Sequence, residues 1–326
     1  MEMMTHGGNL FAAAERAGLD WRQILDFSAS INPLGMSPAS REAILTSIDR
    51  VTHYPERSAS RLRQRLAEEW NVPANRIAAG NGATELLFAW CRRFATGTIV
   101  VPTFGEFHRA WPDAALAPLE GPWPDCGPVA ITRPANPTGA LVDPETVLRY
   151  AYSRRDPVLV DESFIEFCDT PSLVSHAGGN LFVLRSLTKF HALPGLRVGA
   201  LVGDVAELSE APWSVNVLAE AAAIASLDDR DHARRTREFV RSESKWLFEQ
   251  LRGIAGLHPH SPTANYVYAE AARASDLTAF AAARNVLIRD CTGWPGLPAP
   301  AIRVAVRNRW ENEILIALCK EFACRC

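Results

Sequence analysis

The stretch that decides the fold is Ser-Leu-Thr-Lys-Phe-His-Ala-Leu-Pro-Gly-Leu-Arg, residues 186–197. It follows the continuous apolar run 181–184, which is typical of a strand covered on both faces. In an open parallel sheet, ligands bind beyond the carboxyl ends of the strands. The stretch therefore puts two hydroxyls, a lysine and an arginine where such a sheet forms a binding site.

The sequence on both sides of this stretch repeats the same strand-like pattern. Segments between several of the strand-like runs are typical of helices, and alternating strands and helices predict an α/β domain with a mainly parallel sheet. The other predicted strands are 77–79, 98–101, 129–132, 158–160 and 198–202, and the predicted helices are 38–48, 57–70, 83–94 and 144–153.

The C-terminal part has a different pattern. Residues 216–252 predict one or two long helices broken near Asp228-Asp229, and the rest predicts a smaller α+β domain. Its expected strands are 265–269, 286–290 and 302–306, and its expected helices are 275–284 and 310–322. We therefore expect an irregular N-terminal arm (1–40) that joins the small domain and the active site, a large domain (41–212) and a small domain (213–326).

Composition excludes several classes of protein. The 326 residues are 48% hydrophobic and 22% charged, which is typical of a folded globular chain and excludes disorder. A net charge of −3 excludes a global basic field for nucleic acid. No apolar run approaches a membrane span, and the N-terminus has no secretory pattern. The odd number of cysteines, seven, predicts reduced thiols in a cytoplasm, and we expect no metal site at the terminal group Cys319, Cys324 and Cys326.

Polar groups follow the other predicted strands as well. Gly-Asn-Gly-Ala-Thr-Glu (80–85) opens a helix, whose N-terminus attracts anions. Phe104, Asn136 and Asp161 follow three further strands, and the acid would be costly at a buried strand end unless paired. Each has an ordinary structural explanation alone. Together with Lys189 they form the set that pyridoxal 5′-phosphate requires: an amine, an acid for the ring nitrogen, a stacking ring and an anion cradle.

These motifs, in this order, resemble those of the fold-type I pyridoxal-phosphate enzymes in the aminotransferase class I/II group. The resemblance rests on residues 80–85, on Ala-Asn-Pro-Thr-Gly (135–139), on Asp-Glu-Ser-Phe (161–164) and on residues 186–197. It implies a large domain with a mostly parallel seven-stranded sheet and a smaller α+β domain. It also implies a homodimer with shared active sites.

The resemblance assigns roles to individual residues. Lys189 would hold the cofactor and reprotonate the substrate carbon, Asp161 would pair with the pyridinium nitrogen, and Asn136 would bond the phenolic oxygen. Phe104 would stack on the ring, while Phe164 stands where related aminotransferases have a tyrosine. The cofactor phosphate would be held by Gly82, Ala83, Thr84, Ser186, Thr188 and Arg197, with Tyr54 of His-Tyr-Pro-Glu (53–56) reaching the phosphate of the neighbouring subunit.

Two families within this group share the pattern: the threonine-phosphate decarboxylases of cobalamin biosynthesis and the histidinol-phosphate aminotransferases. Residues 6–9, 26–35, 186–197 and 302–307 look like the decarboxylases. That resemblance implies decarboxylation of L-threonine O-3-phosphate to (R)-1-amino-2-propanol O-2-phosphate.

The substrate contacts follow from the same resemblance. Arg303 would bind the carboxylate, and we expect Arg307 rather than Arg309 to add an anion contact. The substrate phosphate would lie under the arm, through His6, Gly7, Gly8 and Asn32.

Two alternatives stay open. One is an aminotransferase for histidinol phosphate that uses 2-oxoglutarate, and the other is a non-catalytic protein that binds the cofactor. Retention of Lys189, Asp161, Asn136 and Arg197 counts against the second. A nucleotide-binding protein is disfavoured because residues 80–84 lack the Gly-Lys-Ser/Thr phosphate loop.

Overall fold

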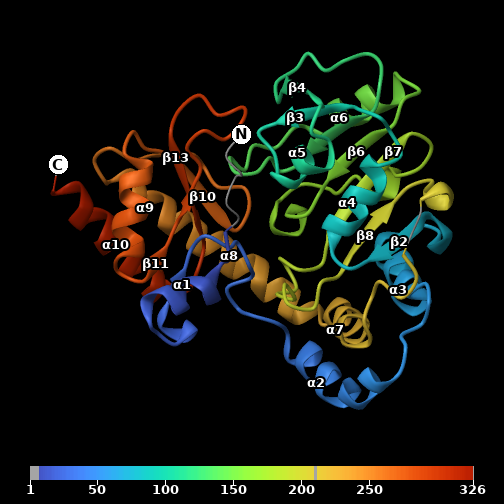
Figure 1. The fold of residues 1–326 in the computed structure, drawn as a ribbon, viewed down its shortest axis with the longest axis horizontal. Coiled ribbons are helices and arrows are strands. Elements are labelled where there is room, and N and C mark those ends of the chain that lie inside the picture. The colour runs from blue at the N-terminus through green and yellow to red at the C-terminus, as the bar shows by residue number, and fades with distance from the viewer. Residues whose placement is uncertain (1–6, 209–210, 326) are drawn as a thin grey trace.

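The structure is a computed structural model that describes residues 7–208 and 211–325. Figure 1 shows a larger unit built on one sheet and a smaller unit, in orange and red, built on another. The blue N-terminal arm lies against the smaller unit before the chain enters the larger one. None of the described helices is both long and apolar enough to cross a membrane.

The large sheet is mostly parallel, as predicted. Its seven strands are ordered β2-β8-β7-β6-β5-β3-β4, and β8 alone runs antiparallel to its two neighbours. The strands are β2 (Ile77–Gly80), β3 (Thr98–Val101), β4 (Ala115–Pro118), β5 (Val129–Thr132), β6 (Val158–Asp161), β7 (Leu181–Ser186) and β8 (Gly199–Val202). The individual strand β4 was not predicted, because this exposed edge strand, Ala-Leu-Ala-Pro, carries no β-branched residue.

Both faces of this sheet are covered by helices, which explains the continuous apolar runs. In β6, Val158 and Val160 face a core shared with α3 (Ser60–Trp70), α6 (Pro144–Tyr152) and α7 (Val217–Asp228). Leu159 faces the opposite core with α4 (Ala83–Cys91) and α5 (Glu106–Ala110). The helix α2 (Pro38–Ser47) packs on α7, where the Ser40 hydroxyl donates to the Ala222 carbonyl at 2.9 Å.

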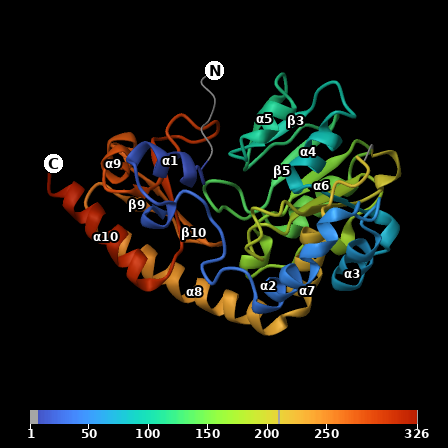
Figure 2. The ribbon, with the colours of Figure 1, turned by 60° about the horizontal axis from the view of Figure 1, so that its bottom comes forward.

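The long helical segment breaks where the sequence predicted. Asp229 separates α7 from α8 (Arg230–Arg252), and its carboxylate caps α8 by accepting from the His232 N–H at 3.0 Å. Helix α8 then runs from the larger to the smaller unit, along the lower edge of the view in Figure 2. Helix α7 packs in a core of the large sheet, although the predicted small domain begins at residue 213. This packing favours a domain boundary at Asp229, and the domain boundaries stay a prediction.

The smaller unit holds a four-stranded antiparallel sheet ordered β12-β13-β10-β9. Its strands are β9 (His258–Pro259), β10 (Tyr266–Glu270), β12 (Arg289–Asp290) and β13 (Ala301–Ala305), and its helices are α9 (Ala274–Ala282) and α10 (Arg309–Ala323). The single predicted strand 286–290 is two short ones, because β11 (Val286–Leu287) pairs with the arm instead. The second, β12, pairs with β13 and brings Arg289 opposite Arg303.

The prediction of an irregular arm was wrong for residues 10–26. The arm forms α1 (Leu10–Ala17), which ends at Gly18 in the left-handed conformation (φ 67°), and β1 (Leu25–Asp26). Strand β1 pairs in parallel with β11, and Phe27 is buried in the core of the smaller unit. The arm is therefore fixed to the smaller unit and leads across to the large sheet. Short 3₁₀ turns lie at Trp21–Gln23, Ile48–Thr52, Ala74–Arg76, Ile165–Phe167, Val174–His176 and Val205–Glu207.

Candidate active site

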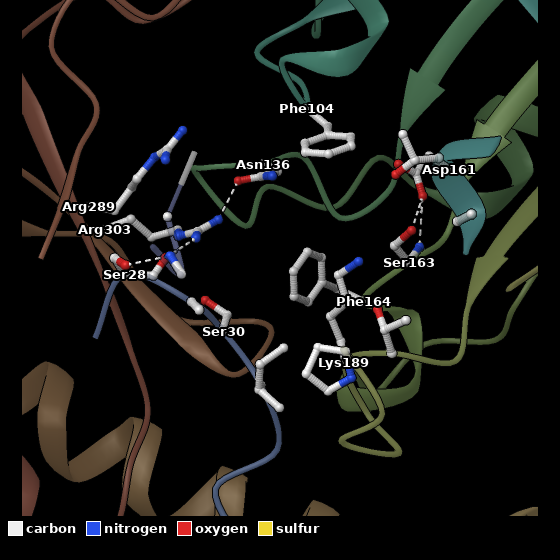
Figure 3. A pocket seen from close by; sticks show the side chains of 18 of the residues that line it. Ser28, Ser30, Phe104, Asn136, Asp161, Ser163, Phe164, Lys189, Arg289 and Arg303 are labelled. Carbon is white, nitrogen blue, oxygen red and sulfur yellow. Dashed lines mark hydrogen bonds between the residues drawn. The ribbon is translucent and has the colours of Figure 1, made fainter. Parts of the chain in front are cut away.

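One cavity of about 440 Å³ collects most of the predicted site residues. It lies where the strand ends of the large sheet, the small sheet and the arm meet, and Figure 3 shows Asp161 and Lys189 on one side and Arg289 and Arg303 on the other. The predicted residues that line it are Gly7, Gly8, Ala83, Thr84, Phe104, Asn136, Asp161, Phe164, Thr188, Lys189, Arg197 and Arg303.

Lys189 lies just past the end of β7. Its Nζ donates to the Ser186 hydroxyl at 3.1 Å and lies 5.9 Å from the centre of the Phe164 ring. Burial lowers the pKa of Lys189 to about 8, Arg197 and Arg303 add to this, and the Asp161 carboxylate opposes it. A neutral amine is the form that attacks an aldehyde, so this environment prepares Lys189 for covalent attachment.

Asp161 ends β6 and is buried. Its Oδ1 accepts two hydrogen bonds from Ser163, from the backbone N–H at 2.9 Å and from the hydroxyl at 2.5 Å. Burial raises the pKa of Asp161, and the two Ser163 bonds and the Lys189 charge oppose that rise. Its Oδ2 makes no hydrogen bond to any described residue, so it is available to a protonated ring nitrogen.

Asn136 and Arg303 meet in the cavity from the two units. The Arg303 Nη1 donates to the Asn136 Oδ1 at 2.6 Å, and its Nη2 donates to the Ser28 carbonyl at 2.9 Å. This fixes the Asn136 oxygen toward Arg303 and turns its amide N–H groups toward the rest of the cavity. Those donors can bond a phenolic oxygen, as the resemblance implies.

The N-terminus of α4 forms an anion cradle with Arg197. Gly82 precedes the helix with φ 83°, a left-handed conformation that favours glycine, and a Cβ there would lie 2.5 Å from the Arg197 Nη2 and displace that guanidinium. Gly82 itself does not line the cavity. Buried Ser186 lies behind the lining and bonds the Thr188 hydroxyl at 2.8 Å.

The donors fit pyridoxal 5′-phosphate. An amine, a carboxylate with a free oxygen, amide N–H groups and a helix N-terminus with an arginine line one cavity, beside the aromatic ring of Phe104. Several buried polar atoms in the same cavity also have no hydrogen-bond partner in the described chain, among them the Nε atoms of Arg289 and Arg303 and the Ser30 hydroxyl. Such atoms are costly unless a ligand meets them.

Arg289 is the main site residue that the sequence prediction missed. It lies in register with Arg303 on the neighbouring strand, is buried, and has no ion pair among the described residues. Burial, with Arg303 as the next cause, lowers the pKa of Arg289 to about 10. Its position depends on strand pairing, which residues 286–290 alone do not reveal. Other unpredicted lining residues include Asp26, Ser28, Ser30, Thr132, Ser163 and Trp294.

Two predicted substrate contacts do not reach the cavity. Asn32 is buried, and its amide donates to the Phe190 carbonyl at 2.8 Å and the Thr236 hydroxyl at 2.9 Å, so it holds the arm to the lysine segment and α8. Arg307 makes a two-bond pair with Glu311 at 2.8 and 3.0 Å, one turn into α10. This geometry does not support the two predicted contacts, because both side chains donate hydrogen bonds to structural partners, and the contacts stay predictions.

The remaining predictions concern the arm and a second subunit. Gly7 packs so tightly that a Cβ would lie 2.3 Å from the Ser28 carbonyl oxygen, and the Gly8 N–H donates to the Ser28 hydroxyl at 2.8 Å. His6 lies outside the described residues. Tyr54 does not line the cavity and is 85% exposed, with its ring 5.3 Å from that of Trp213. Its predicted contact with another subunit stays a prediction.

Comparison with known proteins places the chain in a family. Residues 113–317 match the family model for aminotransferase class I and II. The chain is 35% identical to the threonine-phosphate decarboxylase of Salmonella typhimurium, over 96% of this chain and 94% of that one, and 26% identical to the histidinol-phosphate aminotransferase of Methanosphaera stadtmanae, over 94% and 93%. The solved histidinol-phosphate aminotransferase of Clostridium acetobutylicum superposes with a TM-score of 0.85 at 25% identity, covering 93% of this chain and 100% of that one, which confirms the predicted fold. The chain therefore belongs to the aminotransferase class I and II family.

Proposed function

We propose that the chain is a pyridoxal-phosphate-dependent decarboxylase that converts L-threonine O-3-phosphate to (R)-1-amino-2-propanol O-2-phosphate. The observation that carries the proposal is the pair Arg289 and Arg303, two buried guanidinium groups side by side in the cavity that holds Lys189. Such a pair suits a small ligand with two anionic groups, a carboxylate and a phosphate. The similarity to the Salmonella typhimurium decarboxylase supports the same substrate class.

When bound, pyridoxal phosphate supplies an electron sink for the pair released at the substrate α-carbon. The protein's part is to hold and orient. Asp161 keeps a proton on the ring nitrogen with its free Oδ2, and Asn136 donates an N–H to the phenolic oxygen. Ala83, Thr84 and Arg197 bind the phosphate. Lys189 would anchor the group, and its Nζ would carry a proton taken from the substrate ammonium group and deliver it to the α-carbon in place of CO₂.

Positioning decides which bond breaks. Only the α-carbon bond that stands perpendicular to the cofactor ring releases its electrons into the ring system. Anion contacts at both ends of the substrate fix the rotation about that carbon, and we assign these contacts to Arg289 and Arg303. A carboxylate held perpendicular leaves as CO₂, whereas a perpendicular hydrogen would begin transamination.

Phe164 supports the decarboxylase over an aminotransferase. It lines the cavity, packs edge-on against Tyr266 with ring centres 5.3 Å apart, and carries no hydroxyl. Asn136 is then the main side chain that we assign to the phenolic oxygen. The cavity thus differs from that of the related aminotransferases, which place a tyrosine at this position.

We also propose that the active form is a homodimer in the cytoplasm with shared sites. An apolar surface supports the dimer, because Leu45, Ile48, Val51, Tyr54 and Trp213 are each about half exposed or more. Exposed apolar groups gathered in this way are typical of protein interfaces. Tyr54 would reach the cofactor phosphate of the second copy.

A paired assay of the cofactor-loaded protein tests the reaction. One sample contains L-threonine O-3-phosphate, and CO₂ and aminopropanol phosphate are measured. The other contains histidinol phosphate with 2-oxoglutarate, and glutamate is measured. We expect CO₂ without glutamate. Glutamate without CO₂ would mean that the chain is an aminotransferase instead. If neither sample forms a product although the cofactor is bound, a non-catalytic protein would be favoured.

A further inference from the structure

The loop between β12 and β13, residues 291–300, joins the two units beside the cavity. Its Trp294 is only 5% exposed, lines the cavity, and donates its indole N–H to the Thr103 carbonyl at 2.8 Å. The loop also approaches the end of β3 closely, because a Cβ at Gly296 would lie 2.9 Å from the backbone N of Pro102. Trp294 therefore contacts the residue that precedes Phe104 in the large unit.

The ring face of Trp294 has a second contact. The Arg289 guanidinium carbon lies 4.9 Å from the centre of the ring. Arg289 needs such a partner, because it is buried, lies opposite the like charge of Arg303, and has no ion pair in the described part of the chain. A cation over an indole face is stabilised by the negative potential of the ring, most strongly where water is excluded.

We propose that Trp294 is a positioning residue for anion binding, which holds the Arg289 guanidinium beside Arg303 through its ring face and fixes the ring by the hydrogen bond to Thr103. The identity of the ligand, a phosphorylated amino acid, rests on the proposed function. The stacking itself does not depend on which reaction follows.

The physical argument concerns the freedom of Arg289. A long arginine side chain without the ring would populate other rotamers, driven away from Arg303 by charge repulsion. Bidentate recognition of a phosphate or carboxylate requires the guanidinium in one orientation. Loss of the ring therefore weakens anion binding at Arg289.

Calorimetric titration of the cofactor-loaded protein with inorganic phosphate and with (R)-1-amino-2-propanol O-2-phosphate, the proposed product, tests this role, because the proposed reaction consumes neither probe. Trp294→Leu removes both the ring and the N–H, and we expect it to raise the Kd of both probes by about 30-fold, as for a buried cation–π contact. Trp294→Phe keeps a ring face and loses only the N–H, and we expect a rise of no more than about threefold.

Trp246→Leu is the matched control. Trp246 also carries an arginine over its ring, Arg309 at 4.4 Å, but does not line the cavity, so its loss should leave both Kd values unchanged. Cofactor content and circular dichroism check that each variant is folded. If Trp294→Leu loses the cofactor, Trp294→Met replaces it, because Met fills more of the volume without a ring.

Two outcomes would overturn the inference. The first is a folded, cofactor-loaded Trp294→Leu or Trp294→Met variant that binds both anions as tightly as the unaltered protein. That result would exclude a role of the ring in positioning Arg289. Equal losses in the Phe and Leu variants would show that the Thr103 bond, and not the stacking, matters. If the unaltered protein releases no CO₂ while the ranking of affinities holds, the proposed reaction fails and the role of Trp294 stands.

Discussion

The two walls of the cavity are built in different ways. On the large-sheet side, which we call the first wall, three key groups are held by near neighbours in sequence: Asp161 by Ser163, Lys189 by Ser186, and Arg197 by the Pro194 carbonyl at 3.2 Å. On the opposite side, the second wall, Arg303 bonds Asn136 and Ser28, both distant in sequence, and the Nε of Arg289 has no hydrogen-bond partner among the described residues.

The difference indicates that one wall binds the cofactor and the other binds the substrate. A wall of locally held groups is formed as soon as its strands pair, which suits a cofactor that stays bound. A wall of buried, incompletely bonded arginines suits a ligand that arrives and leaves, because the ligand supplies the missing acceptors. Variants on the first wall should affect cofactor binding, and variants on the second should affect substrate binding.

The largest effect is expected for Lys189→Ala. Loss of the amine removes the covalent anchor and the proton carrier, and we expect activity to fall by at least about 10²–10⁴-fold, the range for one acid–base group. The absorbance of the covalently held cofactor should vanish as well, which spectroscopy of the purified variant would check. Unchanged absorbance would contradict the assignment of the anchor.

The second-largest effect is expected for the pH dependence of the rate of cofactor uptake. Only the neutral amine reacts, so the uptake rate should rise about tenfold per pH unit below the pKa of Lys189 and level off above about 8. A lysine at the ordinary value of 10.5 would keep rising to that pH. Stopped-flow absorbance of the cofactor-free protein between pH 6 and 10 separates the two, and a plateau only near 10.5 would refute the proposed environment.

Arg303→Ala tests the second wall. It removes charge-assisted bonds worth about 1.5–3 kcal/mol each, so kcat/KM should fall by roughly 10- to 100-fold, with much of the loss in KM. Because Arg303 also orients Asn136, a smaller change in the cofactor spectrum should accompany it. Steady-state kinetics with normal KM would argue against a substrate contact.

Ser163→Ala should have a moderate effect on the first wall. Without the hydroxyl bond, burial would raise the pKa of Asp161 further, so its carboxylate would become protonated at a higher pH. The acid side of the pH–activity profile should therefore move upward, with a loss of about 0.5–1.5 kcal/mol in kcat near neutrality. Ser163→Thr keeps the hydroxyl and serves as the control, and identical profiles for both variants would exclude this role.

The smallest effect is expected for Arg307→Ala. Its partly exposed guanidinium is paired with the buried carboxylate of Glu311, so the substitution removes a structural ion pair rather than a ligand contact. Activity should stay within about twofold of the unaltered protein, since no ligand contact is lost. Activity measured beside Arg303→Ala under the same conditions distinguishes the arginine in β13 from the one that follows the strand. A large loss of activity in Arg307→Ala would support the predicted anion contact of Arg307.

The sequence predicted the first wall better than the second for a physical reason. Asp161 directly follows an apolar run, Asn136 and Lys189 come a few residues after one, and each run marks where a parallel strand ends. Arg289 depends on pairing between β12 and β13, and Asn32 on contacts with Phe190 and Thr236 far along the chain. Arg307 lies beyond Ala305, where β13 ends, so the strand that positions Arg303 does not position Arg307.

The most direct test of the two-wall account is a titration of cofactor-loaded Arg289→Ala with (R)-1-amino-2-propanol O-2-phosphate, the proposed product, followed by the absorbance of the bound cofactor. The account predicts full cofactor content and an unchanged starting spectrum, with the Kd of this ligand raised roughly 10- to 100-fold. Unchanged affinity for the ligand, or loss of the cofactor itself, would contradict the division of the cavity into a cofactor-binding first wall and a substrate-binding second wall.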